Sequence, residues 1–158
     1  MSQMQPSRLS GFGIQAFWIQ PGAIKVEIDH LQRMVLPPVE RRYENVWGIP
    51  ITLPVMDIRE ICAEKIRAAS QRARYRDFYD LFLILEKFSP NLDEIVSLMR
   101  QKEVRSIISA ENLRASSQRA AREFTEGKDL MHYSRAISDD AIAAMVATIQ
   151  FEPILPKE

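Results

Sequence analysis

The chain has 158 residues, of which 46% are hydrophobic and 27% are charged, ordinary values for one soluble globular domain. Lysine plus arginine and aspartate plus glutamate both number 21, so the net charge indicates neither nucleic-acid nor membrane binding. Cys62 is the only cysteine, which excludes an intramolecular disulfide and a cysteine-rich metal site. No apolar run is long enough to span a bilayer, and the first residues lack the apolar stretch of a signal peptide, so a cytoplasmic protein is expected.

The first part of the chain is expected to be β structure. Residues 14–19 and 23–29 are short apolar-rich runs, and the Gln-Pro-Gly at 20–22 between them suits a type II turn. The two runs therefore predict an antiparallel hairpin. The Gly-Phe-Gly at 11–13 predicts another turn, because no lysine or serine follows it at the spacing of a phosphate-binding loop.

The run at 23–29 alternates between apolar and charged residues, which is typical of a half-buried strand. Its charged face carries Lys25, Glu27 and Asp29. Such a face is most often simply solvated. The functional interpretation is that Glu27 or Asp29 supplies a carboxylate to a magnesium ion that substrate phosphates share.

Prolines at 37, 38, 50 and 54 exclude a helix over residues 36–56 and discourage central strands. An edge strand or an extended segment that crosses to the first helix is therefore expected around 49–55. Strands followed by helices predict an α+β fold, with antiparallel or mixed strands in a β part at 1–56 and a mainly helical region at 57–158. The expected helices run from Asp57 to a stop within 70–76, from Asp77 to Phe88, over 92–101, over 110–124, and from Ser138 or Asp139 to a stop before Pro153.

The first of these helices carries a lysine where an aliphatic residue is expected. Asp57 is expected to cap the helix, and Glu60, three residues on, to complete a capping box. Lys65 falls in the middle of an apolar stripe formed by Ile58, Ile61, Cys62, Ile66 and Ala69. A lysine is almost never fully buried unless it is paired, so an anionic group is expected to meet Lys65.

Two interpretations of Lys65 remain open at this level. Asp77 borders the apolar face of the next helix, and Asp80 lies one turn further on. In the structural interpretation, Lys65 and Asp77 form an internal ion pair that fixes the packing of the two helices. In the functional interpretation, the lysine ammonium is a compact charge that contacts a triphosphate oxygen.

A basic cluster surrounds the connection between these two helices. Its members are Arg67, Arg72, Arg74 and Arg76. They predict either surface ion pairs that contribute little to stability or a patch that meets nucleotide phosphates or an RNA backbone. The spacing of the arginines does not decide between the two.

Three segments carry a resemblance to a known family: IKVEID at 24–29, PVMDIREICAEKIRAA at 54–69 and RARYRDFYDLFLIL at 72–85. The spacing of E-x-x-x-E-K to R-D-x-Y-D-L resembles the AbiEii/AbiGii toxin family of nucleotidyltransferases over roughly residues 23–88. The resemblance implies a toxin of bacterial toxin–antitoxin and phage-exclusion systems with a polymerase-β-like fold. It also implies transfer of a nucleotidyl group from a nucleoside triphosphate with Mg²⁺, to tRNA in some members, and an antitoxin as partner.

The resemblance also assigns roles to individual residues. Glu27 matches the acidic strand position that holds the metal. Lys65 and Asp77 match catalytic positions. The nucleotide-binding positions that the resemblance implies are Lys65, Arg74, Arg76 and Asp80.

The sequence departs from the family pattern at one motif. Family members carry a Gly-Gly or Gly-Ser turn followed by two metal-binding acidic residues as D-x-D, and the 158 residues contain neither Gly-Ser nor D-x-D. The chain is therefore expected to correspond to the C-terminal portion of such an enzyme, without the metal-binding pair. Either the gene is truncated, or another chain supplies the missing half, or the remnant has a different role. The alternative is a non-catalytic module that binds an antitoxin, RNA or its own copy through an exposed sheet edge.

Overall fold

The computed structural model describes residues 10–14, 22–26, 33–126 and 133–156 of the chain. They belong to two compact units, residues 1–33 and residues 34–158. Two antiparallel pairs of strands precede five helices, which confirms the α+β prediction. The boundary that was expected at 56–57, between the β part and the helical region, lies inside the second unit, between its last strand and its first helix.

In the first unit, β1 (Ser10–Ile14) pairs antiparallel with β2 (Gly22–Val26). An antiparallel pair was expected here, but its first strand precedes the predicted run at 14–19. The Gly-Phe-Gly at 11–13 lies within β1, so the predicted turn there is wrong. Cross-strand partners, more than residue type, decide whether a glycine-containing segment becomes a strand, and these partners are not visible in the local sequence. The expected turn at 20–21 lies outside the described residues.

In the second unit, β3 (Val39–Tyr43) pairs antiparallel with β4 (Ile51–Val55), so that Val39 faces Val55 and Tyr43 faces Ile51. β4 confirms the edge strand expected around 49–55. β3 was not predicted, because the prolines at 37 and 38 made the segment before it appear irregular. Both prolines precede the strand and so leave its hydrogen bonds intact.

The helices are α1 (Ile58–Gln71), α2 (Tyr75–Phe88), α3 (Leu92–Gln101), α4 (Ala110–Thr125) and α5 (Asp139–Thr148). Four of them begin after a capping residue whose side chain accepts a hydrogen bond from a backbone N–H group of the first turn. The capping residues are Asp57, Asn91, Ser109 and Ser138. The cap at Asp57 and the helix at 92–101 are confirmed. α2 begins two residues before the predicted Asp77, which lies in its first turn. No described helix is long and apolar enough to cross a membrane.

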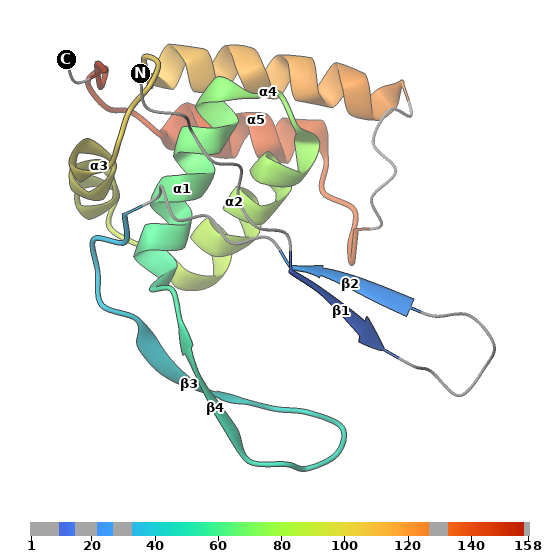
Figure 1. Ribbon diagram of the computed structural model, residues 1–158. Helices are drawn as coiled ribbons and strands as arrows, with labels where there is room; N and C mark the ends of the chain where they lie inside the picture. Colours follow the sequence, from blue (N-terminus) through green and yellow to red (C-terminus); the bar gives the residue numbers. More distant parts are fainter. Residues whose placement is uncertain (1–9, 15–21, 27–32, 127–132, 157–158) are drawn as a thin grey trace, which may run out of the picture. The chain divides into compact units, whose positions relative to one another are not determined.

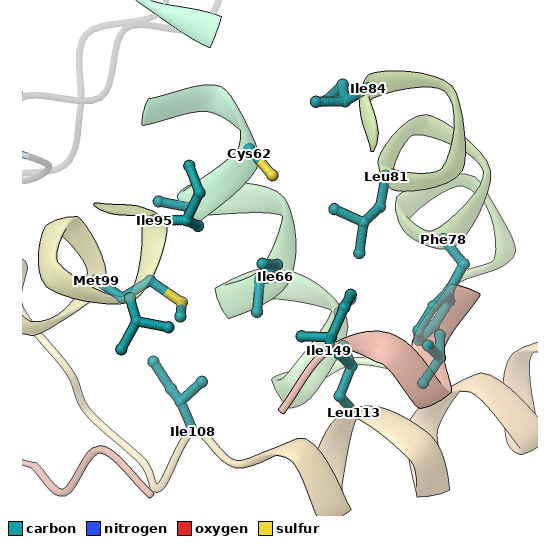
Figure 2. Packing of buried hydrophobic residues seen from close by; sticks show 14 of the residues in the cluster. Cys62, Ile66, Phe78, Leu81, Ile84, Ile95, Met99, Ile108, Leu113 and Ile149 are labelled. Atoms are coloured by element: carbon teal, nitrogen blue, oxygen red, sulfur yellow. The ribbon is translucent and has the colours of Figure 1, made fainter. Parts of the chain in front are cut away.

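The core of the second unit is built around α1, which packs against α2, α3 and α4 (Figure 1). Figure 2 shows Cys62 and Ile66 of α1 between Leu81 of α2 and Ile95 of α3. The predicted apolar stripe is confirmed, since Cys62, Ile66 and Ala69 are fully buried and Ile58 and Ile61 are partly buried. This packing fixes the face of α1 that Lys65 borders.

Glu60 does not complete a capping box, and that prediction is wrong. Its buried carboxylate accepts hydrogen bonds from the backbone N–H groups of Val35 and Leu36, at 2.8 and 2.9 Å, and from Lys102 Nζ at 2.6 Å. Burial acts to raise the pKa of Glu60, but these three hydrogen bonds outweigh it and leave the pKa below its ordinary value. The carboxylate thereby ties the segment before β3, α1 and the end of α3 together.

Candidate functional site

Lys65 meets two carboxylates of α2. Its Nζ lies 2.5 Å from Asp80 Oδ2 and 3.5 Å from Asp77 Oδ1. The lysine side chain is 26% exposed, whereas that of Asp77 is completely buried. The anionic group expected beside Lys65 is therefore present. The internal pair with Asp77 exists, but the shorter contact is made with the half-exposed Asp80.

Asp77 is held mainly by Arg72. The guanidinium donates from Nε to Oδ2 at 2.8 Å and from Nη2 to Oδ1 at 3.1 Å, so both carboxylate oxygens are engaged. Hydrogen bonding to Asp77 raises the pKa of Arg72. Arg72 is the residue directly after α1 and lies five residues before Asp77, so this pair closes the connection between the helices. Sequence reasoning placed Arg72 only in the basic cluster and missed this role.

An open cleft of about 260 Å³ lies beside this pair and is lined mainly by α1. Cations and carboxylates both contribute to its wall, and Arg67 Nη2 lies 2.6 Å from Glu64 Oε2. The lining residues are Glu64, Lys65, Arg67, Ala68, Gln71, Arg72 and Asp77. Each of the three cations has a carboxylate partner, but Lys65 and Arg72 remain partly exposed and keep donors for a further anion.

The two arginines that were predicted to bind nucleotide lie outside this cleft. Arg74 is exposed and caps α2 through its backbone, and Arg76 is half-buried. Neither side chain forms an ion pair with the described residues, and neither lines the cleft. The structure thus brings Lys65, Asp77 and Asp80 together and leaves Arg74 and Arg76 apart from them.

The predicted metal ligand, Glu27, lies outside the described residues. Within the described parts of the chain, no three side chains of histidine, cysteine, aspartate or glutamate form a group that could hold a metal ion. Asp77 and Asp80 both hold cationic side chains instead. The described residues therefore do not fit Mg²⁺, which needs carboxylates free to coordinate it.

A second polar network adjoins the cleft and was not predicted. Lys102 Nζ lies 2.6 Å from Glu60 Oε1 and 2.9 Å from Glu64 Oε1, so one buried ammonium joins two carboxylates of α1. Glu64 in turn bonds Arg67 at the cleft wall. The sequence did contain a signal, because glutamates four residues apart share one helix face and repel each other unless a cation lies between them.

Cys62 cannot supply a nucleophile to this site. The thiol is fully buried in the core, and burial raises its pKa to about 12. A thiolate is therefore almost absent at neutral pH. The structural interpretation of this residue, a small core side chain, is the one that its surroundings support.

Comparison with known proteins places these observations in a family. The family model described as "Nucleotidyl transferase AbiEii toxin, Type IV TA system" matches residues 4–152. The match extends well beyond residues 23–88, where the sequence motifs lie, and covers both units of the structure. No curated protein and no solved structure matches the chain.

Proposed function

Because the chain belongs to the AbiEii family of nucleotidyl transferase toxins of type IV toxin–antitoxin systems, we propose that the cleft beside Lys65 binds the phosphates of a nucleoside triphosphate. The observation that carries this proposal is the convergence of Lys65, Arg67 and Arg72 on one open cleft. The proposed acceptor of the nucleotidyl group is tRNA.

The geometry of the cleft suits a polyanion in two ways. Arg72 is 47% exposed while it holds Asp77, so part of its guanidinium fork faces the solvent and can take a phosphate oxygen. The ammonium group of Lys65 contacts two carboxylates and has three protons to donate, so a donor remains for a phosphate oxygen. In the proposed complex the carboxylates hold both cations in place. The phosphates bind to the cations without displacing the carboxylates.

The proposed reaction is transfer of a nucleotidyl group. An acceptor hydroxyl oxygen forms a bond to the α-phosphorus and gives up its proton to water. The bond from that phosphorus to the bridging oxygen breaks, and pyrophosphate leaves with the electron pair. Lys65 and Arg72 offset the charge of the triphosphate and fix its direction, so their contribution is positioning and electrostatic stabilisation. We propose Glu27 as a ligand of the Mg²⁺ that the family resemblance implies.

A second candidate function is a binding module without catalysis. It is favoured by the β3–β4 hairpin, on which large apolar side chains are exposed, among them Trp47 at 76%. Its proposed partners are an antitoxin protein, RNA or a second copy of the chain. Under this proposal the cleft is a structural junction and nucleotides do not bind to it.

One experiment separates the two candidates. The protein is incubated with each of the four radiolabelled nucleoside triphosphates, total tRNA and Mg²⁺, and label is followed into the RNA. Transfer that requires Lys65 supports the enzyme. A complete absence of both transfer and nucleotide binding, with the chain folded, supports the binding module.

A further inference from the structure

Within its unit, the β3–β4 hairpin pairs with no other described strand. It extends away from the helices of its unit, and no described helix packs against it (Figure 1). Its residues alternate, so one face carries Arg41 together with Val39, Tyr43, Ile51, Leu53 and Val55. Tyr43 is 52% exposed and Leu53 is 44% exposed. An isolated two-stranded hairpin is at best marginally stable in water, so this one is expected to gain from a further strand.

Side-chain hydrogen bonds hold the loop at the tip of the hairpin. The side-chain Oδ1 of Asn45 accepts hydrogen bonds from the backbone N–H groups of Trp47 and Ile49, and its Nδ2 donates to the Ile49 carbonyl at 2.7 Å. Gly48 adopts a φ of +64°, which favours glycine. The loop therefore fixes the register of β3 and β4 and presents both strands in a defined conformation.

The two edges of the hairpin differ in their capacity to accept another strand. β4 contains Pro54, which has no N–H to donate, and proline is a common means of blocking an edge strand. β3 has no proline. It carries Glu40 and Arg42 on one face, and neither side chain forms an ion pair with the described residues. The free edge of β3 is thus the one that can pair.

We propose that a second copy of this chain pairs with β3 in antiparallel orientation, centred on Arg41, so that two hairpins form a four-stranded sheet. In this register Glu40 faces Arg42 of the partner subunit, and the two-fold axis repeats the pair. Val39 likewise faces Tyr43 of the partner subunit on the apolar face. Charges on an edge strand usually oppose pairing with another strand. In this strand, however, the antiparallel register places each charge opposite a charge of the other sign on the identical strand.

The charge balance of the hairpin favours a second copy over a nucleic acid. The hairpin carries two arginines and two glutamates, so it lacks the excess positive charge that nucleic-acid binding requires. The one unfavourable contact in the register is between Arg41 and its copy on the axis. Both arginines are on an exposed strand, where solvent screens this repulsion.

The test is the mass of the full chain in solution, measured by sedimentation equilibrium over a range of concentrations. The unmodified chain is expected to be dimeric. Glu40→Arg or Arg42→Glu alone places like charges opposite each other twice, and is expected to raise the dissociation constant about tenfold or more. The double variant restores the pairs with their signs exchanged, and should dimerise again. An equimolar mixture of the two single variants should form a heterodimer.

Glu44→Arg is the matched control, because it makes the same change of charge outside β3 and is expected to leave the dimer intact. Circular dichroism and the melting temperature establish that each variant is folded. A monomeric unmodified chain, or single variants that dimerise as well as the unmodified chain, would overturn the proposal. The measurement involves no nucleotide, so its failure leaves the proposed nucleotide site untouched.

Discussion

Arg72 and Asp77 form a two-pronged pair across the turn between α1 and α2, with hydrogen bonds of 2.8 and 3.1 Å. Because Arg72 occupies both oxygens of the buried carboxylate, Lys65 is left 3.5 Å from one of them and makes its short contact with Asp80. The lysine therefore sits at the edge of a satisfied buried pair and is not required to neutralise it. Lys65 could therefore bind a ligand without leaving the buried Asp77 carboxylate unpaired, because Arg72 still holds it.

Lys65→Ala is expected to weaken nucleoside triphosphate binding by tenfold or more and to leave the fold intact, because the lysine is partly exposed and Asp77 keeps Arg72. Isothermal titration calorimetry measures the affinity. Lys87→Ala, an exposed lysine near the end of α2, is the matched control and should bind as the unmodified chain does. Equal affinities of the two variants would remove Lys65 from the site.

Arg72→Ala is expected to lower the free energy of unfolding by about 1–3 kcal/mol, because the buried Asp77 carboxylate loses both of its hydrogen bonds to the guanidinium. Arg74→Ala removes an equivalent side chain that is exposed and lines no cleft, and should change stability by less than about 0.5 kcal/mol. Urea denaturation followed by circular dichroism gives both values. Similar losses in the two variants would contradict the role assigned to Arg72.

Lys102→Met is expected to destabilise the chain by about 3–5 kcal/mol, because it leaves Glu60 and Glu64 close together without the buried cation between them. Adding Glu60→Gln to this variant should recover part of the loss, since one of the two unpaired charges is then removed. The four unfolding free energies of the double-mutant cycle give the coupling. A coupling near zero would show that the buried pair contributes no specific stability.

The pKa of Glu60 predicts how stability depends on pH. Hydrogen bonds hold this pKa below 4.5 in the folded chain, whereas the unfolded chain has the ordinary value of 4.5. The ionised carboxylate therefore contributes stability fully above pH 4.5, and the contribution is lost as the pH falls through the folded-state pKa. Urea denaturation between roughly pH 6 and 3 should give a steeper loss for the unmodified chain than for Glu60→Gln. Parallel curves would contradict the prediction.

The helices could be predicted from the sequence because their signals are local. Caps at Asp57, Ser109 and Ser138 lie within three residues of the N–H groups that they bond, and the 3.6-residue period marks the buried faces. β3 lacks such a signal, since its pairing with β4 is set by a loop and by cross-strand partners. Glu60 was misassigned for the same reason, because its partner Lys102 lies 42 residues further along the chain.

The candidate site could be predicted only in part. The position of Lys65 on an apolar stripe was sufficient to require an anionic partner, and a short connection brought Asp77 and Asp80 within reach. Which cation takes the buried carboxylate depends on side-chain directions at the turn, and the sequence pattern did not distinguish Arg72 from Arg74 or Arg76. The structure makes that distinction, since Arg72 is the one of these three arginines that bonds Asp77.

The bend between α1 and α2 contains only residues 72–74, and its backbone is already bonded, from Arg72 N–H to the Ala68 carbonyl and from Arg74 N–H to the Arg72 carbonyl. One inserted residue would rotate the start of α2 and carry Asp77 and Asp80 out of reach of their cations. Relatives that use this junction should therefore keep its length constant.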